Sequence, residues 1–369
     1  MRIASFNVEN LFERAKAFNM EDKEAARVVL EQYARLNDLF NQPAYSKADK
    51  AEMVELLGKL GLAERDDGGE FALLRQNRGR LLRRPLAGGT EIIASGRADW
   101  IGWVELKSEP VNELAMQHTA MVIRDVGADV QAVVEADNRI ALKKFSEIAL
   151  EAIGGQPYEH VMLIDGNDDR SIDVALLTKS GYEIAAIASH VDDSDAQGEI
   201  FSRDCPEYTV ATPDGERLVL LVNHLKSKGF GSQSSSNAKR RRQARRVAQI
   251  YRRLIAEGQT NVIVLGDLND TPDSAPLASL LAQTDLRDIT THPSFTSDGR
   301  PGTFGNGTKS QKIDYVLLSP ALFARVTGGA IFRKGVWGGK QGTLFPHFPT
   351  ITKPVEAASD HAAIYADLK

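Results

Sequence analysis

Cysteine is nearly missing from this sequence, in which Cys205 is the single example among 369 residues. One cysteine cannot form an intramolecular disulfide, and it excludes a metal site made of closely spaced cysteine pairs. Long apolar runs are missing as well, because no stretch approaches the ~18 residues of a membrane-spanning helix. The N-terminal segment MRIASFNVENLF lacks the apolar core and cleavage site of a secretory signal. These absences predict a cytoplasmic protein of a reducing compartment, with no membrane as partner.

An excess of charge of one sign is missing too. The 45 Lys and Arg residues against 50 Asp and Glu residues give a net charge of −5. A nucleic acid would therefore have to bind at a local basic patch, because the overall charge does not attract it. Hydrophobic residues make up 42% and charged residues 26%, which is typical of a soluble globular protein with a large core.

The hydrophobic pattern predicts many strands with helices between them. Strands are predicted at 2–8, 129–135, 170–179, 217–227, 261–269, 312–319 and 362–368, and helices at 21–40, 46–60, 112–126 and 237–257. The second helix has Ser46 as its N-cap and ends at Gly61. The first is predicted to bury one face formed by Ala25, Val28, Val29, Tyr33 and Leu36. Residues 64–90 are predicted to be irregular, 91–106 a β-hairpin and 328–342 a surface loop. This order favours a mixed α/β sandwich over a doubly wound parallel sheet.

Polar residues gather at or just beyond the ends of the apolar runs: Asn7, Glu135, His224, Asp267, Asn269, Asp314, Asp360 and His361. Strand ends of one protein can converge on one rim, and loops on a rigid scaffold commonly carry function. Convergence would collect four carboxylates, two carboxamides and two imidazoles in one cleft. Such an oxygen-rich set without thiolates suits Mg²⁺ or Mn²⁺ better than zinc. The remaining acids and histidines would be free for acid–base chemistry on a phosphodiester.

Each of these residues taken alone also has a structural interpretation. Asp267 and Asn269 are common in turns, and a histidine such as His224 is often a hydrogen-bonded, half-buried residue. Glu135 could form an ion pair with Arg139, Asp314 could form one with Lys312, and Asp360 could be a cap or turn residue. Only the joint occurrence of the residues, in this order and at these strand ends, favours the functional interpretation.

The ordered motifs resemble the endonuclease/exonuclease/phosphatase superfamily. They are SFNVENL (5–11), VVEADNR (133–139), VNHLKS (222–227), VLGDLND (264–270), KIDYVLL (312–318) and SDHAAI (359–364). This superfamily includes pancreatic-type deoxyribonucleases, exonuclease III-type repair enzymes, neutral sphingomyelinases and inositol polyphosphate phosphatases. The stretch HLKS, followed by the basic segment SNAKRRRQA (236–244), is most similar to bacterial extracellular nucleases. The resemblance implies a four-layer α/β sandwich, with two mixed β-sheets packed face to face and helices outside.

The resemblance also implies a metal site and a base for water. Glu135 would be the principal Mg²⁺ ligand, with Asn7 close by and Asp360 beside the metal or its waters. Mn²⁺ could take the place of Mg²⁺. Asp267 would orient and deprotonate the attacking water, and Asn269 would hold the water or the phosphate in line.

Three further residues would serve the phosphate in the resembling enzymes. Asp314 would orient the imidazole of His361 toward the phosphoryl oxygens, and His224 would contact the phosphate or assist the leaving oxygen. The implied reaction is a metal-assisted, in-line attack of water on a phosphodiester, as in a nuclease acting on DNA or RNA. The alternatives are a phosphatase or phospholipase C-type hydrolase of a phosphorylated lipid or small molecule, and a binding protein without activity. For a lipid enzyme, LFPHFPTI (344–351) is the candidate membrane-docking loop.

Several cationic residues bear on the substrate. The predicted helix at 237–257 has eight cationic residues before its first acid, Glu257: Lys239, Arg240, Arg241, Arg242, Arg245, Arg246, Arg252 and Arg253. It is either a solvated helix face or a surface that follows nucleic-acid phosphates. Its buried face is predicted to be Ala244, Val247, Ile250, Tyr251 and Leu254. Lys226 and Lys228 are predicted to meet flanking phosphates. Arg170 reaches the scissile phosphate or pairs with Asp168 or Asp173.

A long segment between Asn7 and Glu135 departs from the superfamily pattern. We expect one catalytic domain over residues 1–369 with an insertion at about 16–115, which includes Trp100 and Trp103. The insertion could grip single-stranded nucleic acid through Trp and Arg, mediate a dimer, or pack on the sandwich. Nucleic acid, DNA in the first place, is the expected partner, and the oligomeric state is open.

Overall fold

The computed structural model describes the chain except residues 10, 12, 21–22, 87–88, 169–171 and 229–231. Two compact units make up the chain. Unit 1 comprises Met1–Phe12, Val111–Lys228 and Ser234–Lys369, and unit 2 comprises Glu13–Pro110 together with Gly229–Gln233. None of the helices in the described part of the chain combines the length and the apolar character that crossing a membrane requires.

Unit 1 is built on two mixed β-sheets. In the described residues one sheet has seven strands, in the order β18 (Phe295–Thr296), β20 (Val326–Phe332), β21 (Ala363–Leu368), β1 (Arg2–Asn7), β8 (Val130–Ala136), β10 (Asp173–Thr178) and β9 (His160–Ile164). The other has six, in the order β11 (Glu183–Ala188), β14 (Glu207–Ala211), β15 (Arg217–His224), β16 (Val262–Asp267), β19 (Asp314–Leu318) and β17 (Arg287–Asp288). Most neighbours are antiparallel, but three pairs are parallel in the described residues: β1 with β8, β15 with β16, and β18 with β20.

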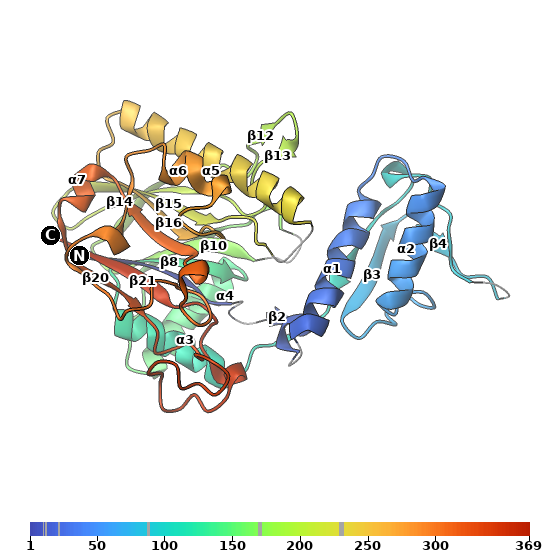
Figure 1. The fold of residues 1–369 in the computed structure, drawn as a ribbon, viewed down its shortest axis with the longest axis horizontal. Coiled ribbons are helices and arrows are strands. Elements are labelled where there is room, and N and C mark those ends of the chain that lie inside the picture. Colours follow the sequence, from blue (N-terminus) through green and yellow to red (C-terminus); the bar gives the residue numbers. More distant parts are fainter. Residues whose placement is uncertain (10, 12, 21–22, 87–88, 169–171, 229–231) are drawn as a thin grey trace. The chain divides into compact units, whose positions relative to one another are not determined.

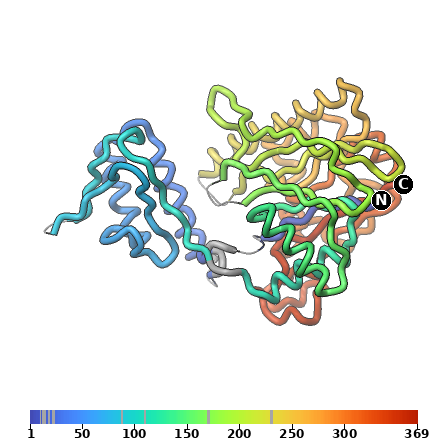
Figure 2. Tube along the Cα trace, turned by 180° about the vertical axis from the view of Figure 1, so that it is seen from behind, coloured from blue at the N-terminus to red at the C-terminus, as the bar shows by residue number. Residues whose placement is uncertain are grey.

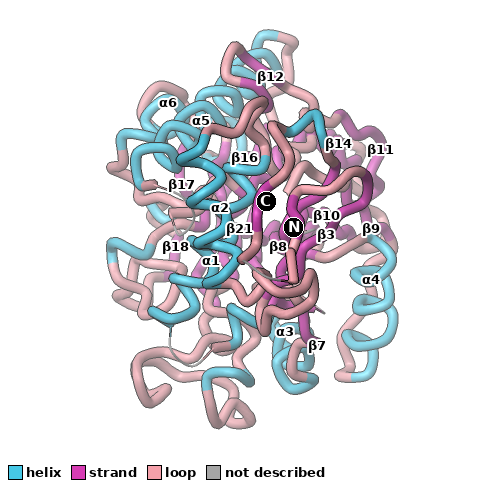
Figure 3. Tube along the Cα trace, turned by 90° about the vertical axis from the view of Figure 1, so that its right-hand side faces the viewer, coloured by secondary structure: helices cyan, strands magenta, loops and turns pink. Residues whose placement is uncertain are grey.

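Three apolar layers hold the two sheets and their helices together. The central layer lies between the sheets, where Val134 and Leu176 of one meet Leu220 and Leu265 of the other. A second layer joins the seven-stranded sheet to α3 (Glu113–Val126), α4 (Arg139–Lys144) and the π-helix that continues it (Phe145–Leu150). A third joins the six-stranded sheet to α5 (Gln233–Ala256) and α6 (Ala278–Leu281). Figures 1 and 3 show α5 and α6 on one side of the strands and α3 and α4 on the other, which confirms the four-layer α/β sandwich.

The two termini lie side by side at one end of the sandwich, as Figures 1 and 2 show. The first and last strands, β1 and β21, are antiparallel neighbours, and the amino group of Met1 donates to the carbonyl oxygen of Leu368 at 2.8 Å. Asn7, at the end of β1, and Ala363, at the start of β21, therefore lie at the opposite end of the sheet, which is the rim that carries the site described below.

Short elements fill the connections of unit 1. They are the strands β12 (Ser194–Asp195) and β13 (Gly198–Glu199), the helix α7 (Pro320–Phe323), and 3₁₀ turns at Ala275–Leu277, Ile289–Thr291, Lys309–Gln311 and Pro354–Glu356. The predicted strands and the predicted helices at 112–126 and 237–257 are confirmed, with small shifts at their ends. In α5 the five residues predicted to be buried are buried.

Unit 2 has a small core of its own. The helices α1 (Lys23–Phe40) and α2 (Lys47–Lys59) pack on one face of a strand pair, β3 (Ala72–Arg78) and β6 (Ile101–Leu106). Two further pairs are β4 (Leu82–Arg83) with β5 (Glu91–Ile92) and β2 (Glu13–Ala15) with β7 (Ser108–Pro110). Short 3₁₀ turns occupy Lys16–Asn19 and Arg97–Asp99. Ser46 caps α2 through a capping box with Asp49, as its position in the sequence predicts.

The pairing of strands in unit 2 corrects the predicted hairpin at 91–106. Strand β6 pairs with β3, which lies in the segment predicted to be irregular, and β5 pairs with β4. This arrangement buries Ala72 and Leu74 of β3 together with Val104 of β6. A local pattern of alternating apolar residues cannot choose among several partners, because burial of a shared core decides the pairing.

Two smaller predictions are also wrong. The glycine-rich segment 328–342 begins inside β20, whose pairing with β21 places Gly329 and Ala330 in the sheet. On α1, Val28 is 41% exposed, and the buried stripe runs through Ala26, Leu30, Tyr33 and Leu36. Tyr33 and Leu36 are buried as predicted, so the predicted face is correct in the second half of the helix and shifted by about one residue in the first half.

Candidate active site

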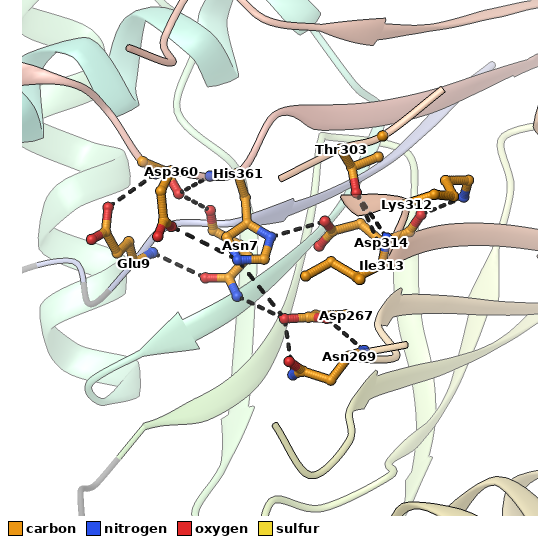
Figure 4. Close-up of polar contacts among 12 residues, drawn as sticks. Asn7, Glu9, Asp267, Asn269, Thr303, Lys312, Ile313, Asp314, Asp360 and His361 are labelled. Carbon is orange, nitrogen blue, oxygen red and sulfur yellow. Dashed lines mark hydrogen bonds and ion pairs between the residues drawn. The ribbon is translucent and has the colours of Figure 1, made fainter. Parts of the chain in front are cut away.

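The sheet register brings the predicted residues to one rim of unit 1. In the six-stranded sheet His224 lies opposite Asp267, and Asp267 lies opposite Asp314. In the other sheet Asn7 lies opposite Val134, next to Glu135. The Nδ2 group of Asn7 joins the two rows, because it donates to Asp267 Oδ2 at 3.2 Å and to Glu135 Oε1 at 3.3 Å. Figure 4 shows Asn7, Asp267, Asp314 and His361 pointing toward one another.

Three backbone conformations aim these side chains. Gly266 has a φ of 124°, and a Cβ there would lie 2.0 Å from the carbonyl oxygen of Asn223, so only glycine lets β16 approach β15 at this point. Asn269 has a φ of 55°, a conformation that asparagine tolerates better than most residues. Glu135 has a φ of 68°, which is uncommon for glutamate and indicates local strain at a position where a carboxylate is aimed.

The Asp267 carboxylate is buried at the centre of the site. It accepts hydrogen bonds from the backbone N–H of Asn269 at 2.8 Å and from the Nδ2 groups of Asn269 and Asn7 at 3.1 and 3.2 Å. Burial raises the pKa of Asp267 above its usual range, and the carboxylate of Asp314 raises it further. A cation nearby would stabilise its charged form, which is the form that can accept a proton from water.

His361 and Asp314 form a buried pair beside Asp267. Nδ1 of His361 donates to Asp314 Oδ2 at 2.9 Å, and Nε2 lies 4.0 Å from Asp267 Oδ2. Burial alone lowers the pKa of His361, but Asp314 and the other carboxylates outweigh it and hold that pKa well above its usual range. This raised pKa favours the imidazolium form, in which Nε2 can donate to an anionic oxygen.

The ion pairs that neighbouring cations in the sequence suggest for Glu135 and Asp314 do not form. Arg139 donates to the carbonyl oxygen of Val161, and Glu135 Oε1 lies 3.6 Å from His224 Nε2. Lys312 donates to the backbone oxygen of Asp314 at 2.6 Å, while its ion pair is with Asp288. His224 Nε2 also lies 3.8 Å from Asp267 Oδ2, so His224 faces the carboxylates from within the sheet.

Asp360 lies at the open side of the site. Its side chain is 46% exposed and lies 3.8 Å from His361 Nε2, and its backbone N–H donates to Glu9 Oε2 at 3.0 Å. The backbone oxygen of Asp360 accepts from Gly305. Its position is therefore fixed through the backbone, while its carboxylate faces solvent.

Four residues that support the site were not predicted. Ser359 Oγ donates to the backbone oxygen of Asn7 and accepts from the backbone N–H of His361, so it ties β1 to the last motif. Glu9 holds Asp360, Thr303 Oγ1 accepts from the backbone N–H of Asp314 at 3.0 Å, and Phe304 lies against the ring of His361. Ser359 and Glu9 stand inside motifs, which could have indicated them, whereas Thr303 and Phe304 lie in a loop without any such signal.

The donor set fits a hard divalent cation. Within the described chain, the His, Asp and Glu donor atoms that converge within 4.8 Å are those of Asp267, Asp314 and His361. Asp314 Oδ1 is buried without a hydrogen-bond partner in this described part of the structure. Glu135 and Asn7 add a carboxylate and a carboxamide at hydrogen-bonding distance from each other. Several buried acids with oxygen donors and no thiolate are the surroundings in which Mg²⁺ or Mn²⁺ binds.

The three residues predicted to contact phosphate, Lys226, Lys228 and Arg170, have different surroundings or lie outside the described residues. Lys228 is 44% exposed and pairs with Asp270 at 2.6 Å, at the end of the GDLND motif. The backbone of Lys226 is held by Gln243 and Arg240 of α5. Arg170 lies outside the described residues. Of the two acids considered as its partners, Asp168 pairs with the buried Arg203 at 2.8 Å, and Asp173 accepts from the backbone of Gly166.

The cations of α5 are largely occupied by carboxylates of the same unit. Arg240 is fully buried and pairs with Asp270 at 2.9 Å. Arg242 pairs with Asp195, Arg246 with Asp193, and Arg253 with Glu207 and Glu257. Arg241 is exposed. The pairs with Asp193, Asp195 and Glu207 fasten the helix to the segment 193–207. Neither of the two predicted interpretations, a solvated face or a phosphate-binding face, included this role.

Known proteins were compared with the sequence and with the fold of this chain. No curated protein matches the sequence. Among solved structures, a mannosyl-6-phosphatase of Bacteroides thetaiotaomicron is 14% identical, with a TM-score of 0.50 over 69% of this chain and 91% of that chain. A truncated TDP2 of Caenorhabditis elegans is 15% identical, with a TM-score of 0.47 over 69% and 90%. The catalytic domain of human nocturnin, with bound sulfate, is 15% identical, with a TM-score of 0.47 over 71% and 88%.

A family model gives the decisive match. The model of the Endonuclease/Exonuclease/phosphatase family matches residues 87–318, which is more than half of the chain. That segment contains Glu135, His224, Asp267 and Asp314, while Asn7 and His361 lie outside it and reach the same rim through the fold. The resemblance inferred from the motifs is confirmed, and this chain belongs to the Endonuclease/Exonuclease/phosphatase family, whose members hydrolyse phosphoester bonds.

Proposed function

We propose that this protein is a Mg²⁺-dependent phosphodiesterase, and that it is a nuclease cleaving DNA or RNA. One observation carries the proposal: Asp267 accepts three N–H groups while facing the imidazole of the His361–Asp314 pair. A fixed carboxylate beside a cationic imidazole can remove a proton from water next to an anionic phosphate. Both elements serve attack by water on a phosphoester.

Each residue has a chemical task in this proposal. Asp267 takes a proton from the attacking water. The water oxygen forms a bond to phosphorus, and the bond from phosphorus to the leaving oxygen breaks. His361, oriented by Asp314, donates from Nε2 to a phosphoryl oxygen. Asn269 holds the water or the phosphate, and His224 serves the phosphate or the leaving oxygen. General-base help of this kind typically contributes ~10²–10⁴-fold in rate.

Glu135 and Asn7 are the proposed ligands of the cation, with Asp360 at its open side. A bound Mg²⁺ neutralises phosphoryl oxygens as a Lewis acid and lowers the repulsion that a nucleophile meets. The proposal places the catalytic domain in the sandwich, with the segment of unit 2 as an insertion in it. Lys226, Lys228 and Arg170 are proposed to contact the substrate phosphate, which for Lys228 requires exchanging Asp270 for a phosphate oxygen.

A second candidate is hydrolysis of a small phosphate ester. The ion pairs of α5 favour it, because they leave few cations on that helix for a nucleic-acid backbone. The solved mannosyl-6-phosphatase has the same fold, so the fold is compatible with this activity. A lipid substrate gains no support from the segment 344–351, where Phe345, Phe348 and Ile351 are buried in the core.

A substrate panel tests the proposal. Plasmid DNA, single-stranded DNA, RNA, bis(p-nitrophenyl) phosphate, a sugar phosphate and sphingomyelin are incubated with Mg²⁺, with Mn²⁺ or with EDTA. We expect cleavage of nucleic acid that EDTA abolishes. Hydrolysis of the sugar phosphate or the lipid with nucleic acid left intact would assign the second candidate, and no metal-dependent hydrolysis of any substrate would refute phosphoester chemistry.

Variants connect the activity to the site. Asp267→Ala and His361→Ala are each expected to lower turnover by at least ~10²-fold, because removing one transition-state group commonly costs that much. Asp273→Ala is the matched control, since Asp273 is an exposed acid six residues beyond Asp267. Circular dichroism of all three variants verifies that the fold is kept.

A further inference from the structure

The strand pair β3–β6 of unit 2 has one covered and one uncovered face. On the covered face Ala72, Leu74 and Val104 are buried against α1 and α2. The residues that alternate with them form the other face, which we call the open face: Leu73, Arg75, Arg78, Ile101, Trp103 and Glu105. None of these six is buried, and Ile101 is 47% exposed.

The open face combines an aromatic ring with arginines. Trp103 lies opposite Arg75 across the strand pair, and Ile101 lies opposite Arg78. Arg75 is held by a two-pronged ion pair with Glu105, at 2.7 and 3.2 Å, which neutralises the one acid on this face. The other tryptophan of the unit, Trp100, is buried in the core and donates to the hydroxyl of Tyr45, whereas Trp103 is half-buried and does not belong to that core cluster.

The segment that contains β3 and the residues after it carries positive charge only. Residues 71–90 contain five arginines and no acidic residue. Arg75, Arg83 and Arg84 are paired with Glu105, Glu91 and Asp66. Arg78 and Arg80 are exposed, and within the described structure no carboxylate pairs with either of them. Gly79 between them has a φ of 69°, and a Cβ there would lie 2.4 Å from the carbonyl oxygen of Asp99, so this tight turn requires glycine.

We infer that the open face, extended by Arg80, is a binding site for single-stranded nucleic acid, an inference that rests on the proposed function and deepens it. A base stacks on the ring of Trp103, and the exposed guanidinium groups of Arg78 and Arg80 contact neighbouring phosphates. A half-buried aromatic ring on an open strand pair, next to exposed arginines, is the combination that single strands use, because every base offers a ring face and every nucleotide offers a charge. The unpaired charge on this surface is positive throughout, which favours a polyanion such as a nucleic-acid strand.

Binding is measured apart from cleavage. Full-length protein in EDTA is titrated into fluorescein-labelled oligo(dT) of twenty nucleotides and into a blunt duplex of the same length, with fluorescence anisotropy as the readout. Trp103→Ala is expected to weaken binding to the single strand by at least about fivefold, the lower end of what base stacking contributes. Trp103→Phe keeps a ring and is expected to retain most of the affinity.

The arginines have a charge-matched control. Arg78→Gln with Arg80→Gln is expected to weaken binding and to reduce the slope of log affinity against log salt by ~1.4, or ~0.7 for each lost phosphate contact. Lys47→Gln with Lys50→Gln removes the same charge from α2, on the helical side of the unit, and is expected to leave both quantities unchanged. Trp103→Ala is expected to leave the salt slope unchanged, because stacking releases no counterions.

Tryptophan fluorescence reports on the contact directly. The chain has three tryptophans, and oligo(dT) is expected to quench the emission of the wild type and of Trp337→Phe but not of Trp103→Phe. Unchanged affinity in Trp103→Ala and in the arginine double variant would overturn the inference. Binding of the duplex at least as tight as binding of the single strand, with no quenching, would also overturn it. The same holds if the variants keep their affinity for oligo(dT) but change their oligomeric state, as measured by sedimentation.

Hydrolysis of bis(p-nitrophenyl) phosphate separates this inference from the proposed function. That substrate is too small to require a second binding surface, so all the variants of unit 2 are expected to hydrolyse it like the wild type. Metal-dependent hydrolysis without oligonucleotide binding would refute the inference and keep phosphodiesterase chemistry. Oligonucleotide binding that depends on Trp103, without any hydrolysis, would refute the enzyme and keep the binding site.

Discussion

At the scale of single residues, the site is organised around the burial of charge. Asp267 and Asp314 are almost fully buried, and the buried imidazole of His361 lies beside both carboxylates. Buried acids destabilise a fold unless hydrogen bonds or cations compensate them. Asn7, Asn269 and His361 supply part of that compensation, and a divalent cation, as proposed above, would supply more of it.

The pair of His361 and Asp314 gives the first prediction. Asp314→Asn keeps the shape of the side chain but removes the charge that holds His361 protonated and in one orientation. Turnover of bis(p-nitrophenyl) phosphate is expected to fall by at least ~10²-fold, in protein that circular dichroism verifies to be folded at the assay temperature. Asp285→Asn, an acid that pairs with Tyr251 far from the rim, should keep full turnover. Equal turnover of both variants would exclude the orienting role of Asp314.

Asp173 gives a prediction about pH. Burial raises the pKa of Asp173 to about 7 from an ordinary value of 3.8. The folded protein therefore binds this proton more tightly than the unfolded chain does, and the stability gained is complete below pH 3.8 and is lost as pH rises through about 7. Asp173→Asn has no ionisation and can still accept from the backbone N–H of Gly166.

The advantage of Asp173→Asn over the wild type is therefore expected to grow between pH 5 and about pH 7 and to level off above it. Urea unfolding in EDTA at several pH values measures it. Asp214→Asn serves as the control, because the hydrogen bond from Thr212 lowers the pKa of Asp214 and places its titration below this window. Parallel stability curves for Asp173→Asn and the wild type would show that Asp173 ionises as freely in the folded protein as in the unfolded chain.

At the scale of elements, α5 shows how a structural role can hide in a basic sequence. Eight cationic residues in one helix suggest a nucleic-acid surface, yet the helix uses them to hold its own unit together. Arg240 is the clearest case: it is fully buried, pairs with Asp270, and donates to Lys226 O at 2.5 Å and to Asn237 at 2.7 Å. It thus fastens the helix to the loop that follows Asp267.

Arg240→Ala is expected to lower the free energy of unfolding by about 3 kcal/mol, because removing one partner leaves a buried carboxylate with less compensation. Arg241→Ala, one position along on the exposed side, should change it by no more than about 0.5 kcal/mol. Urea unfolding of both variants provides the comparison. Similar small losses of stability, with both variants impaired in oligonucleotide binding, would restore the phosphate-binding interpretation of the helix.

Strands and motifs could be predicted from the sequence where a local run of residues determines them. The buried runs at β8, β15 and β16 are continuous and end in polar residues, so both their position and the site at their ends could be predicted. The pairing of β6 with β3 could not, because only the shared core of unit 2 selects it. The support from Thr303 and Phe304 could not be predicted either, since loops far apart in sequence meet only after the sheets have formed.

At the scale of the whole molecule, the connection between the two units is the informative feature. The chain enters unit 2 through β2 and leaves it through β7, and Glu13 lies opposite Pro110 in that antiparallel pair. Residues opposite each other in antiparallel strands are only ~5 Å apart. A few flexible residues can therefore bridge the point where the chain departs from the sandwich and the point where it returns.

Replacing residues 13–110 with a short Gly-Ser linker is accordingly expected to yield a folded protein. Each unit has a hydrophobic core of its own, and segments whose ends lie close together are commonly removable. Metal-dependent kcat/KM for bis(p-nitrophenyl) phosphate should stay within about threefold of the full chain, because Asn7, Glu135, Asp267, Asp314 and His361 all belong to unit 1. Affinity for oligo(dT) should fall at least as far as in Trp103→Ala. A soluble, folded but inactive protein would mean that the inserted segment completes the active site, and the assignment of catalysis to the sandwich alone would then be wrong.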